Sequence, residues 1–207
     1  MREHLQELIA SVEGTTDGVA RKETEHCFVA VIADVNALKE ASRIEHQEQY
    51  EIRTEPDHKD PQGVNGVIRV RAVDRKQYVL TTKIYYKARR GCTESEVETT
   101  KDMFNQFKAM APTGHEKYRH YFPIEGSEAE WEVDVYIDDE GNYEPWVRME
   151  LEVGKLTDGI PDFPFEVKEF IDCAQSKMTD KEKKKVDGLY KSTFIKKLKS
   201  NFLPVAK

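Results

Sequence analysis

Pairs of like charges two residues apart recur along this chain, and they constrain its fold more than any other feature. The pairs are Glu23 and Glu25, Arg69 and Arg71, Glu96 and Glu98, Lys117 and Arg119, Glu132 and Asp134, and Glu150 and Glu152. Successive side chains of a β-strand point to opposite faces, so residues at positions i and i+2 share a face. The alternate residues are mostly apolar, as at Ile68, Val70 and Ala72. The pattern therefore predicts strands with one ionised and one apolar face.

Seven strands are predicted, separated in several places by turns rich in Gly, Asn, Asp and Pro. They cover Glu23–Ala33, Val67–Ala72, Tyr78–Tyr86, Glu94–Thr100, Glu116–Phe122, Trp131–Asp138 and Val147–Val153. Apolar residues at helical spacing predict helices at about 5–12, 36–50, 167–174 and 189–198. Central strands with helices before and after them are typical of a single α+β domain built on an antiparallel sheet.

Two arrangements of this sheet are consistent with the alternation. An ordinary antiparallel sheet turns its apolar face to the core and its charged face to water. However, like charges opposite one another destabilise a sheet, and all seven strands would carry charge on the same face. A closed antiparallel β-barrel with that face inside is the other arrangement, because buried charges must be paired or must bind ions. Amphipathic helices at both ends would then cover the apolar exterior.

The residue types on the ionised face indicate what such an interior would bind. Rows of carboxylates supply hard oxygen ligands of the kind that Mg²⁺ and Mn²⁺ prefer. Rows of arginine and lysine supply hydrogen-bond donors and positive charge for phosphate groups. An interior with both kinds of row is predicted to bind a complex of a divalent metal with a polyphosphate.

Composition and motifs exclude several other classes of protein. Of the 207 residues, 38% are hydrophobic and 34% are charged, and no apolar run approaches the roughly 20 residues that span a bilayer. Three widely spaced cysteines indicate a reducing cytoplasm rather than a disulfide framework. No P-loop, dinucleotide-binding or zinc-ligand spacing occurs. The net charge is −7, yet residues 177–207 hold ten lysines against three acidic residues, and this basic tail could contact nucleic acid.

The order of the charged pairs resembles the CYTH domain, also called the triphosphate tunnel metalloenzyme fold. Glu23-Thr24-Glu25-His26-Cys27 resembles the family's opening ExExK strand, Ile68-Arg69-Val70-Arg71 its RxR strand, and Thr81-Thr82-Lys83 its TxK. Later strands follow in the family's order at Glu96-Val97-Glu98, Lys117-Tyr118-Arg119, Trp131-Glu132-Val133-Asp134 and Glu150-Leu151-Glu152. The resemblance implies one domain over residues 1–207, with an eight-stranded tunnel at about 20–155 and a helical segment at about 160–205.

The resemblance also implies a role for each charged position. The metal, Mg²⁺ or Mn²⁺, would be held by Glu23, Glu25, Asp134, Glu150 and Glu152. The phosphates would be held by Arg69, Arg71, Lys83, Lys117 and Arg119. Glu96 and Glu98 would brace these cations, and Glu132 would assist Asp134.

The function expected from the resemblance is metal-dependent hydrolysis of an organic or inorganic triphosphate. Family members hydrolyse inorganic triphosphate, thiamine triphosphate or nucleoside triphosphates, cleave RNA 5′-triphosphates or cyclise adenylates. This chain departs from the family at Cys27, which stands where the family has lysine. A thiolate there is disfavoured, because neighbouring carboxylates raise the pKa of a thiol. The alternative is therefore a non-catalytic protein that binds a nucleotide, a polyphosphate or an RNA 5′-triphosphate end, with the basic tail recruiting RNA.

Overall fold

The computed structural model describes residues 21–23, 25–53, 64–86, 92–137, 143–153, 159–173 and 178–189. Its strands are β1 (Arg21–Glu23), β2 (Glu25–Ile32), β3 (Arg43–Arg53), β4 (Val64–Val73), β5 (Gln77–Tyr86), β6 (Cys92–Glu98), β7 (Thr113–Pro123), β8 (Glu130–Ile137), β9 (Tyr143–Glu152) and β10 (Val167–Asp172). Its helices are the 3-10 helix η1 (Val35–Glu40), the α-helix α2 (Lys101–Met110) and a helical stretch at 180–189. None of the helices within these ranges has the length and apolar content needed to cross a lipid bilayer.

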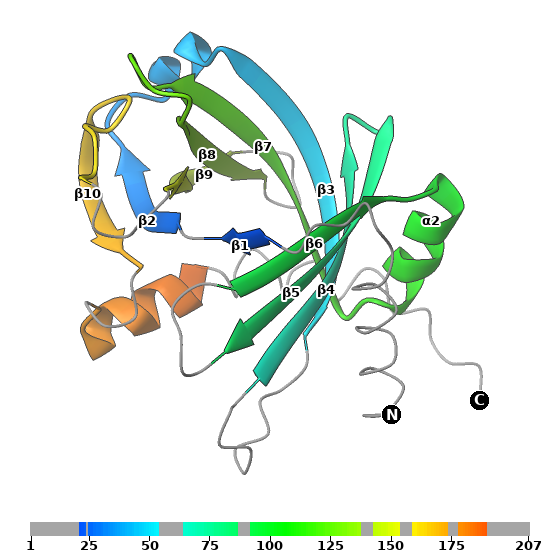
Figure 1. Ribbon diagram of the computed structural model, residues 1–207. Helices are drawn as coiled ribbons and strands as arrows, with labels where there is room; N and C mark the ends of the chain where they lie inside the picture. The colour runs from blue at the N-terminus through cyan, green and yellow to red at the C-terminus, as the bar shows by residue number, and fades with distance from the viewer. Residues whose placement is uncertain are drawn as a thin grey trace.

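The strands form one antiparallel sheet, as expected, in the order β1-β6-β5-β4-β3-β7-β8-β9-β2-β10. Only residue 24 separates β1 from β2 in the chain, yet the two pair with strands at opposite ends of this order. β1 pairs with β6, whereas β2 pairs with β9 on one side and with β10 on the other. The sheet is therefore strongly curved, and Figure 1 shows its strands arranged around a common space.

The apolar face of the sheet is its outer, convex side. On β8 and β9, Trp131, Val133 and Met149 are almost completely buried in one hydrophobic cluster. The segment that leads into β10 covers this cluster, and the ring of Phe163 meets the ring of Trp131 edge-on with centroids 5.5 Å apart. The apolar residues that alternate with charged ones along the strands are thus buried on the convex side of the sheet.

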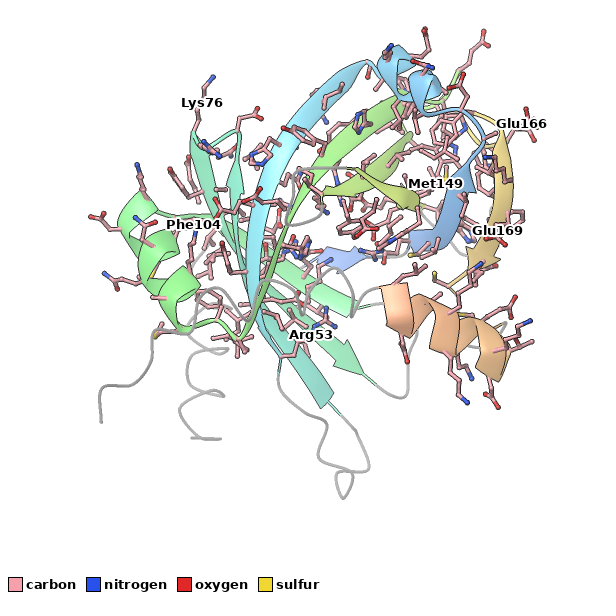
Figure 2. All side chains as sticks on the ribbon, turned by 180° about the vertical axis from the view of Figure 1, so that it is seen from behind. Arg53, Lys76, Phe104, Met149, Glu166 and Glu169 are labelled. Carbon is pink, nitrogen blue, oxygen red and sulfur yellow. The ribbon has the colours of Figure 1, made fainter. Side chains whose placement is uncertain are left out.

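Helix α2 covers the outer side of β3 and β4. Its first turn is capped by Thr100, whose side chain accepts a hydrogen bond from the backbone N–H of Met103 at 3.2 Å. Its buried residues are Phe104 and Phe107, which pack with Tyr50 of the sheet. Figure 2 labels Phe104 on this helix. This helix was not predicted from the sequence, because only two of its ten residues are buried and its apolar stripe is short.

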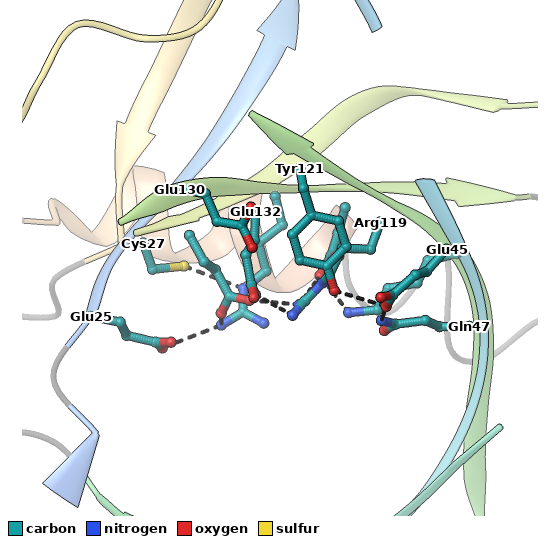
Figure 3. A network of polar contacts seen from close by, with 12 residues as sticks. Glu25, Cys27, Glu45, Gln47, Arg119, Tyr121, Glu130 and Glu132 are labelled. Atoms are coloured by element: carbon teal, nitrogen blue, oxygen red, sulfur yellow. Dashed lines mark hydrogen bonds and ion pairs between the residues drawn. The ribbon is translucent and has the colours of Figure 1, made fainter. Parts of the chain in front are cut away.

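The ionised face lies on the inner, concave side. Figure 3 shows Glu25, Arg119, Glu132 and Gln47 pointing into the space that the strands surround. Toward one end the same face becomes apolar. There, a second cluster is formed by Val29, Tyr136, Trp146, Ile171 and Val186, the last from the helical stretch at 180–189. The interior is therefore divided into an ionised part and an apolar end.

Two predicted helices are wrong. The stretch 36–50 divides into η1 and the first part of β3, and 167–174 contains β10. β3 pairs on both sides, with β4 and β7, and this pairing decides its conformation over the local spacing of apolar residues. β10 forms hydrogen bonds along the edge of β2. The helices predicted at about 5–12 and 189–198 lie outside the described residues, apart from Leu189.

Candidate functional site

Lys117 and Arg119 of β7 form the centre of the ionised face. Arg119 lies opposite Asp134 of β8 and donates two hydrogen bonds to it, from Nε to Oδ1 at 2.7 Å and from Nη2 to Oδ2 at 2.9 Å. Lys117 donates to the same carboxylate. Arg119 also contacts Glu132, and its Nη2 donates to Oε2 of Glu150 on β9 at 2.9 Å. These two cations and Asp134 are buried, so they form a paired ionic network inside the sheet.

Burial and mutual contact shift the pKa values of this network. Burial would raise the pKa of the Asp134 carboxyl, but Arg119 and Lys117 outweigh it and hold that pKa well below its usual range. Burial would lower the pKa of the Arg119 guanidinium, but Asp134 and the other carboxylates raise it well above its usual value. Burial, reinforced by repulsion from Arg119, lowers the pKa of Lys117 to about 7. The charge of Lys117 therefore changes near neutral pH.

Carboxylates of β2 and β9 lie beside this network. Antiparallel pairing sets Glu25 opposite Glu152 and Cys27 opposite Glu150. Arg148 of β9 links the two strands, with its Nη2 3.6 Å from Oε1 of Glu25 and in contact with Oε1 of Glu150. Burial would raise the pKa of Glu150, but Arg148 and Arg119 lower it below its ordinary value. Glu150 is thus an ionised carboxylate held between two guanidinium groups.

A divalent cation would have to be held by the carboxylates of β2 and β9. Among the described side chains, which leave out that of Glu23, no group of three or more His, Cys, Asp or Glu could hold a metal ion. Mg²⁺, however, is usually bound by one or two carboxylates together with the phosphates of its ligand. Glu25 and Glu152 face each other across β2 and β9, and Glu152 is exposed. Their donor chemistry fits this second arrangement.

Cys27 is a neutral thiol. Its Sγ accepts a hydrogen bond from Nε of Arg148 at 3.3 Å, and its backbone carbonyl accepts one from the N–H of Cys173 at 2.8 Å. A hydrogen bond with the Cys173 side chain, together with burial, raises the pKa of the Cys27 thiol well above its ordinary value. Cys27 is therefore unsuited to act as a nucleophile, and the positive charge beside it comes from Arg148.

A second basic group lies on β4 and β5. Nη2 of Arg69 is 3.2 Å from Glu94 and 3.3 Å from Glu96, and Nη2 of Arg71 is 3.3 Å from Glu96. Lys83 contacts Glu94 at 2.8 Å. Burial, with repulsion from Arg69, lowers the pKa of the Arg71 guanidinium. The buried Nε atoms of Arg69 and Arg71 have no hydrogen-bond partner within the described part of the chain.

The remaining predicted carboxylates, Glu96, Glu98 and Glu23, differ in their surroundings. Glu96 accepts a hydrogen bond from Oγ1 of Thr81 at 2.7 Å, in addition to its contacts with the two arginines of β4. Burial would raise its pKa, but Arg71, Thr81 and Arg69 lower it. Glu98 is exposed at the end of β6. The side chain of Glu23 lies outside what the structure describes, although its backbone pairs with Cys92.

Glu94, Arg148, Gln47 and Gln49 belong to the ionised face but were not predicted from the sequence. The first two each lie two residues before a predicted charge, at Glu96 and Glu150, so extending the same alternation would have found them. The two glutamines lie in the part of β3 that was predicted to be helical, within 36–50. Their face could not be identified without the strand.

No family model matches the chain, and a search of curated proteins found no match. Solved structures do resemble it. The inorganic triphosphatase NE1496 is 14% identical, with a TM-score of 0.42 over 78% of this chain and 93% of that protein. HpAC1 from Hippeastrum, for which a dominant triphosphatase activity is described, is 14% identical, with a TM-score of 0.43 over 64% and 80%. PH1819 from Pyrococcus horikoshii OT3 is 16% identical, with a TM-score of 0.40 over 87% and 91%.

Proposed function

We propose that this chain is a triphosphate-binding phosphohydrolase whose site is the inner, ionised face of the sheet. One observation carries the proposal: the predicted phosphate-binding cations all lie on this face and are each at most 16% exposed. They are Arg69, Arg71, Lys83, Lys117 and Arg119. Guanidinium groups gathered in a partly desolvated interior suit the recognition of phosphate. The two unpartnered Nε groups on β4 are donors that phosphate oxygens can satisfy.

The proposed site requires a closed tunnel. In this arrangement β1, which pairs with β6, and β2, which pairs with β9, would together serve as one strand of the barrel. Eight strands would then close the barrel, with β10 as an added strand beside β2. The apolar cluster around Trp146 and Val186 would fill one end. A charged ligand would therefore enter from the other end.

The carboxylates that contact the cations are proposed to orient them. Asp134 holds Lys117 and Arg119, and Glu96 holds Arg69 and Arg71. Such contacts fix planar guanidinium groups in one direction. Phosphoryl transfer depends largely on positioning and electrostatic stabilisation, which preoriented cations supply without reorganisation. Asp134 is accordingly proposed as a brace for the basic groups, because its carboxylate is already shared by two cations.

Mg²⁺ or Mn²⁺ is proposed to bind together with the triphosphate. Glu25 and Glu152 would hold it, with Glu23 and Glu150 as the neighbouring carboxylates of the same two strands, and phosphate oxygens would complete its coordination. When bound, the metal would neutralise phosphate oxygens and polarise the phosphoryl group. Arg148, which contacts both Glu25 and Glu150, would hold these two carboxylates in place.

Phosphate release tests the proposal directly. The substrates are tripolyphosphate, ATP, thiamine triphosphate and 5′-triphosphate RNA, each with Mg²⁺ and with Mn²⁺. We expect release from at least one, and Arg71→Ala should reduce affinity for it on the order of tenfold or more, because a charge-assisted hydrogen bond is lost. Arg75→Ala, at an exposed arginine in the β4–β5 turn, is the matched control. Absence of phosphate release from every one of these substrates would overturn the proposal.

A non-catalytic binding protein is the second candidate, and the neutral thiol of Cys27 favours it. In that case calorimetry should show triphosphate binding that Arg71→Ala weakens, without turnover of any substrate. If residues 177–207 recruit RNA, the affinity for 5′-triphosphate RNA should fall steeply with salt concentration, because bound counterions are released. A flat salt dependence would count against that role of the tail.

A further inference from the structure

Two cysteines face each other across β2 and the end of β10. The register of these strands pairs Asp172 with Phe28. At the next position the backbone N–H of Cys173 donates to the carbonyl oxygen of Cys27 at 2.8 Å. Directly opposed residues of an antiparallel pair carry their side chains on the same face. The two thiols are accordingly hydrogen-bonded to each other, and both residues are partly exposed.

The separation that strand pairing sets suits a disulfide bond. The Cα atoms of directly opposed residues in an antiparallel pair lie about 4.5–5.5 Å apart. Cysteines joined by a disulfide have Cα atoms about 4.4–6.8 Å apart. Cys27 and Cys173 are free thiols, so a bond between them requires no large movement of either strand.

Cys173 is the more reactive of the two thiols. Its hydrogen bond with Cys27, together with the positive charge of Arg148, outweighs burial and lowers the pKa of Cys173 below its ordinary value. The thiolate is the form that attacks a disulfide, and partly exposed thiols near a cation are typical of redox-active cysteines. The sulfur of Cys27 instead accepts a hydrogen bond from Nε of Arg148 at 3.3 Å. Cys173 is therefore the first to react with an oxidant, and Cys27 is in place to react second.

We propose that Cys27 and Cys173 are a modification site, at which a low-molecular-weight disulfide such as oxidised glutathione converts the two thiols into a reversible disulfide. Cys173 attacks one sulfur of the oxidant and forms a mixed disulfide, and its proton goes to the departing thiolate. Cys27 then attacks the sulfur of Cys173 within the same molecule, and its proton goes to the second departing thiolate. Two protein thiols are thus oxidised to one disulfide while one small disulfide is reduced to two thiols. In a reducing compartment such a pair stays reduced until the oxidant rises.

The bond would fasten the apolar end of the interior. Cys173 packs against the apolar cluster that contains Val29 and Ile171, and Val186 of the helical stretch at 180–189 belongs to the same cluster. A disulfide therefore ties the end of β10, beside this cluster, covalently to β2. The inference is independent of the proposed function, because no triphosphate takes part in the reaction or in its measurement.

Oxidation of the full chain by oxidised glutathione tests the inference. After alkylation of the remaining thiols, mass spectrometry of peptides should find Cys27 linked to Cys173 in wild type and in Cys92→Ser. The latter is the matched control, because Cys92 lies on β6 and pairs with Tyr85 and Glu23. The melting temperature of both proteins should rise by about 5–15 °C on oxidation, since the bond restricts the unfolded chain. Dithiothreitol should reverse the rise.

Two further variants separate the roles of the two thiols. In Cys27→Ser, Cys173 should accumulate as a mixed disulfide with glutathione, because no second thiol displaces it. In Cys173→Ser, Cys27 should react with glutathione disulfide on the order of tenfold more slowly, and equal rates in the two variants would refute the assigned order of attack. Neither variant should show the rise in melting temperature. A disulfide that involves Cys92, a wild-type protein that stops at the mixed disulfide, or a melting temperature that falls on oxidation would overturn the inference.

Discussion

Arg119 and Asp134 meet across β7 and β8 in a two-point contact, with an Nε–Oδ1 distance of 2.7 Å and an Nη2–Oδ2 distance of 2.9 Å. Asp134 is completely buried, and Lys117 contacts the same carboxylate. One carboxylate thus contacts both buried basic groups of β7. The same contact therefore stabilises the sheet and orients Lys117 and Arg119.

Asp134→Asn should therefore destabilise the protein strongly. Removing one partner of a buried ion pair leaves an uncompensated charge, which costs about 3–5 kcal/mol. Urea unfolding followed by circular dichroism measures this loss. Glu128→Gln, at an exposed loop residue, should change the free energy of unfolding by no more than about 0.5 kcal/mol. A loss below about 1 kcal/mol for Asp134→Asn would show that the two cations find other partners.

Triphosphate binding should be accompanied by proton uptake near pH 8. The pKa of Lys117 is about 7 in the folded protein, so most of this side chain is neutral at that pH. A bound polyanion favours the charged ammonium and raises its pKa, so binding draws a proton from the buffer. Calorimetry in buffers with different ionisation enthalpies measures the uptake. Lys117→Arg, which stays charged throughout, should abolish it.

The lowered pKa of Lys117 also predicts how the stability of the protein changes with pH. The folded pKa of Lys117, about 7, lies below the ordinary value of 10.5, so between these two pH values the unfolded chain binds more protons. Stability contributed by this group should therefore rise with pH through that window. Urea midpoints for wild type and Lys117→Met, compared from pH 6.5 to pH 9, test the sign. A wild-type midpoint that falls relative to the variant over this range would contradict it.

Cys27→Lys should increase phosphate release. Cys27 lies opposite Glu150 and in contact with Arg148, so a lysine there would add an ammonium group beside the carboxylate corner. A positioned proton donor or acceptor accelerates such reactions on the order of 10²-fold or more. The measurement is phosphate release under saturating tripolyphosphate with Mg²⁺. Cys27→Met, which adds length without charge, is the control, and equal rates for the two variants would show that the charge is not what matters.

Removal of divalent cations should weaken triphosphate binding. Chelation with EDTA leaves Glu25 and Glu152 to repel the phosphates, because both carboxylates face the proposed site. In Glu25→Gln, half of this pair is neutral, so affinity without metal should rise while its dependence on Mg²⁺ becomes shallower. Glu40→Gln, at an exposed residue of η1, should behave as wild type. A Mg²⁺ dependence that is identical in Glu25→Gln would exclude this residue as a ligand.

The charged side chains could be assigned to one face from the sequence alone. Arg69 with Arg71 and Lys117 with Arg119 lie on the same side because strand alternation is a local property of the backbone. The same reasoning failed for β3 and β10. There, apolar residues at helical spacing favoured a helix, and hydrogen bonds with distant strands decided otherwise. With β3 misassigned, Gln47 and Gln49 could not be recognised as part of the site.

The amino-acid sequence alone thus determined which charged residues share the inner face and which apolar residues are buried on the outer face. Both follow because side chains alternate between the two faces with a period of two along each strand. The contacts themselves came from folding in three dimensions. Arg119 reaches Glu150 across 31 positions, and Arg69 reaches Glu94 across 25, because strand register and sheet order bring those segments side by side. No local rule encodes that register, which depends on how all the strands share one curved sheet.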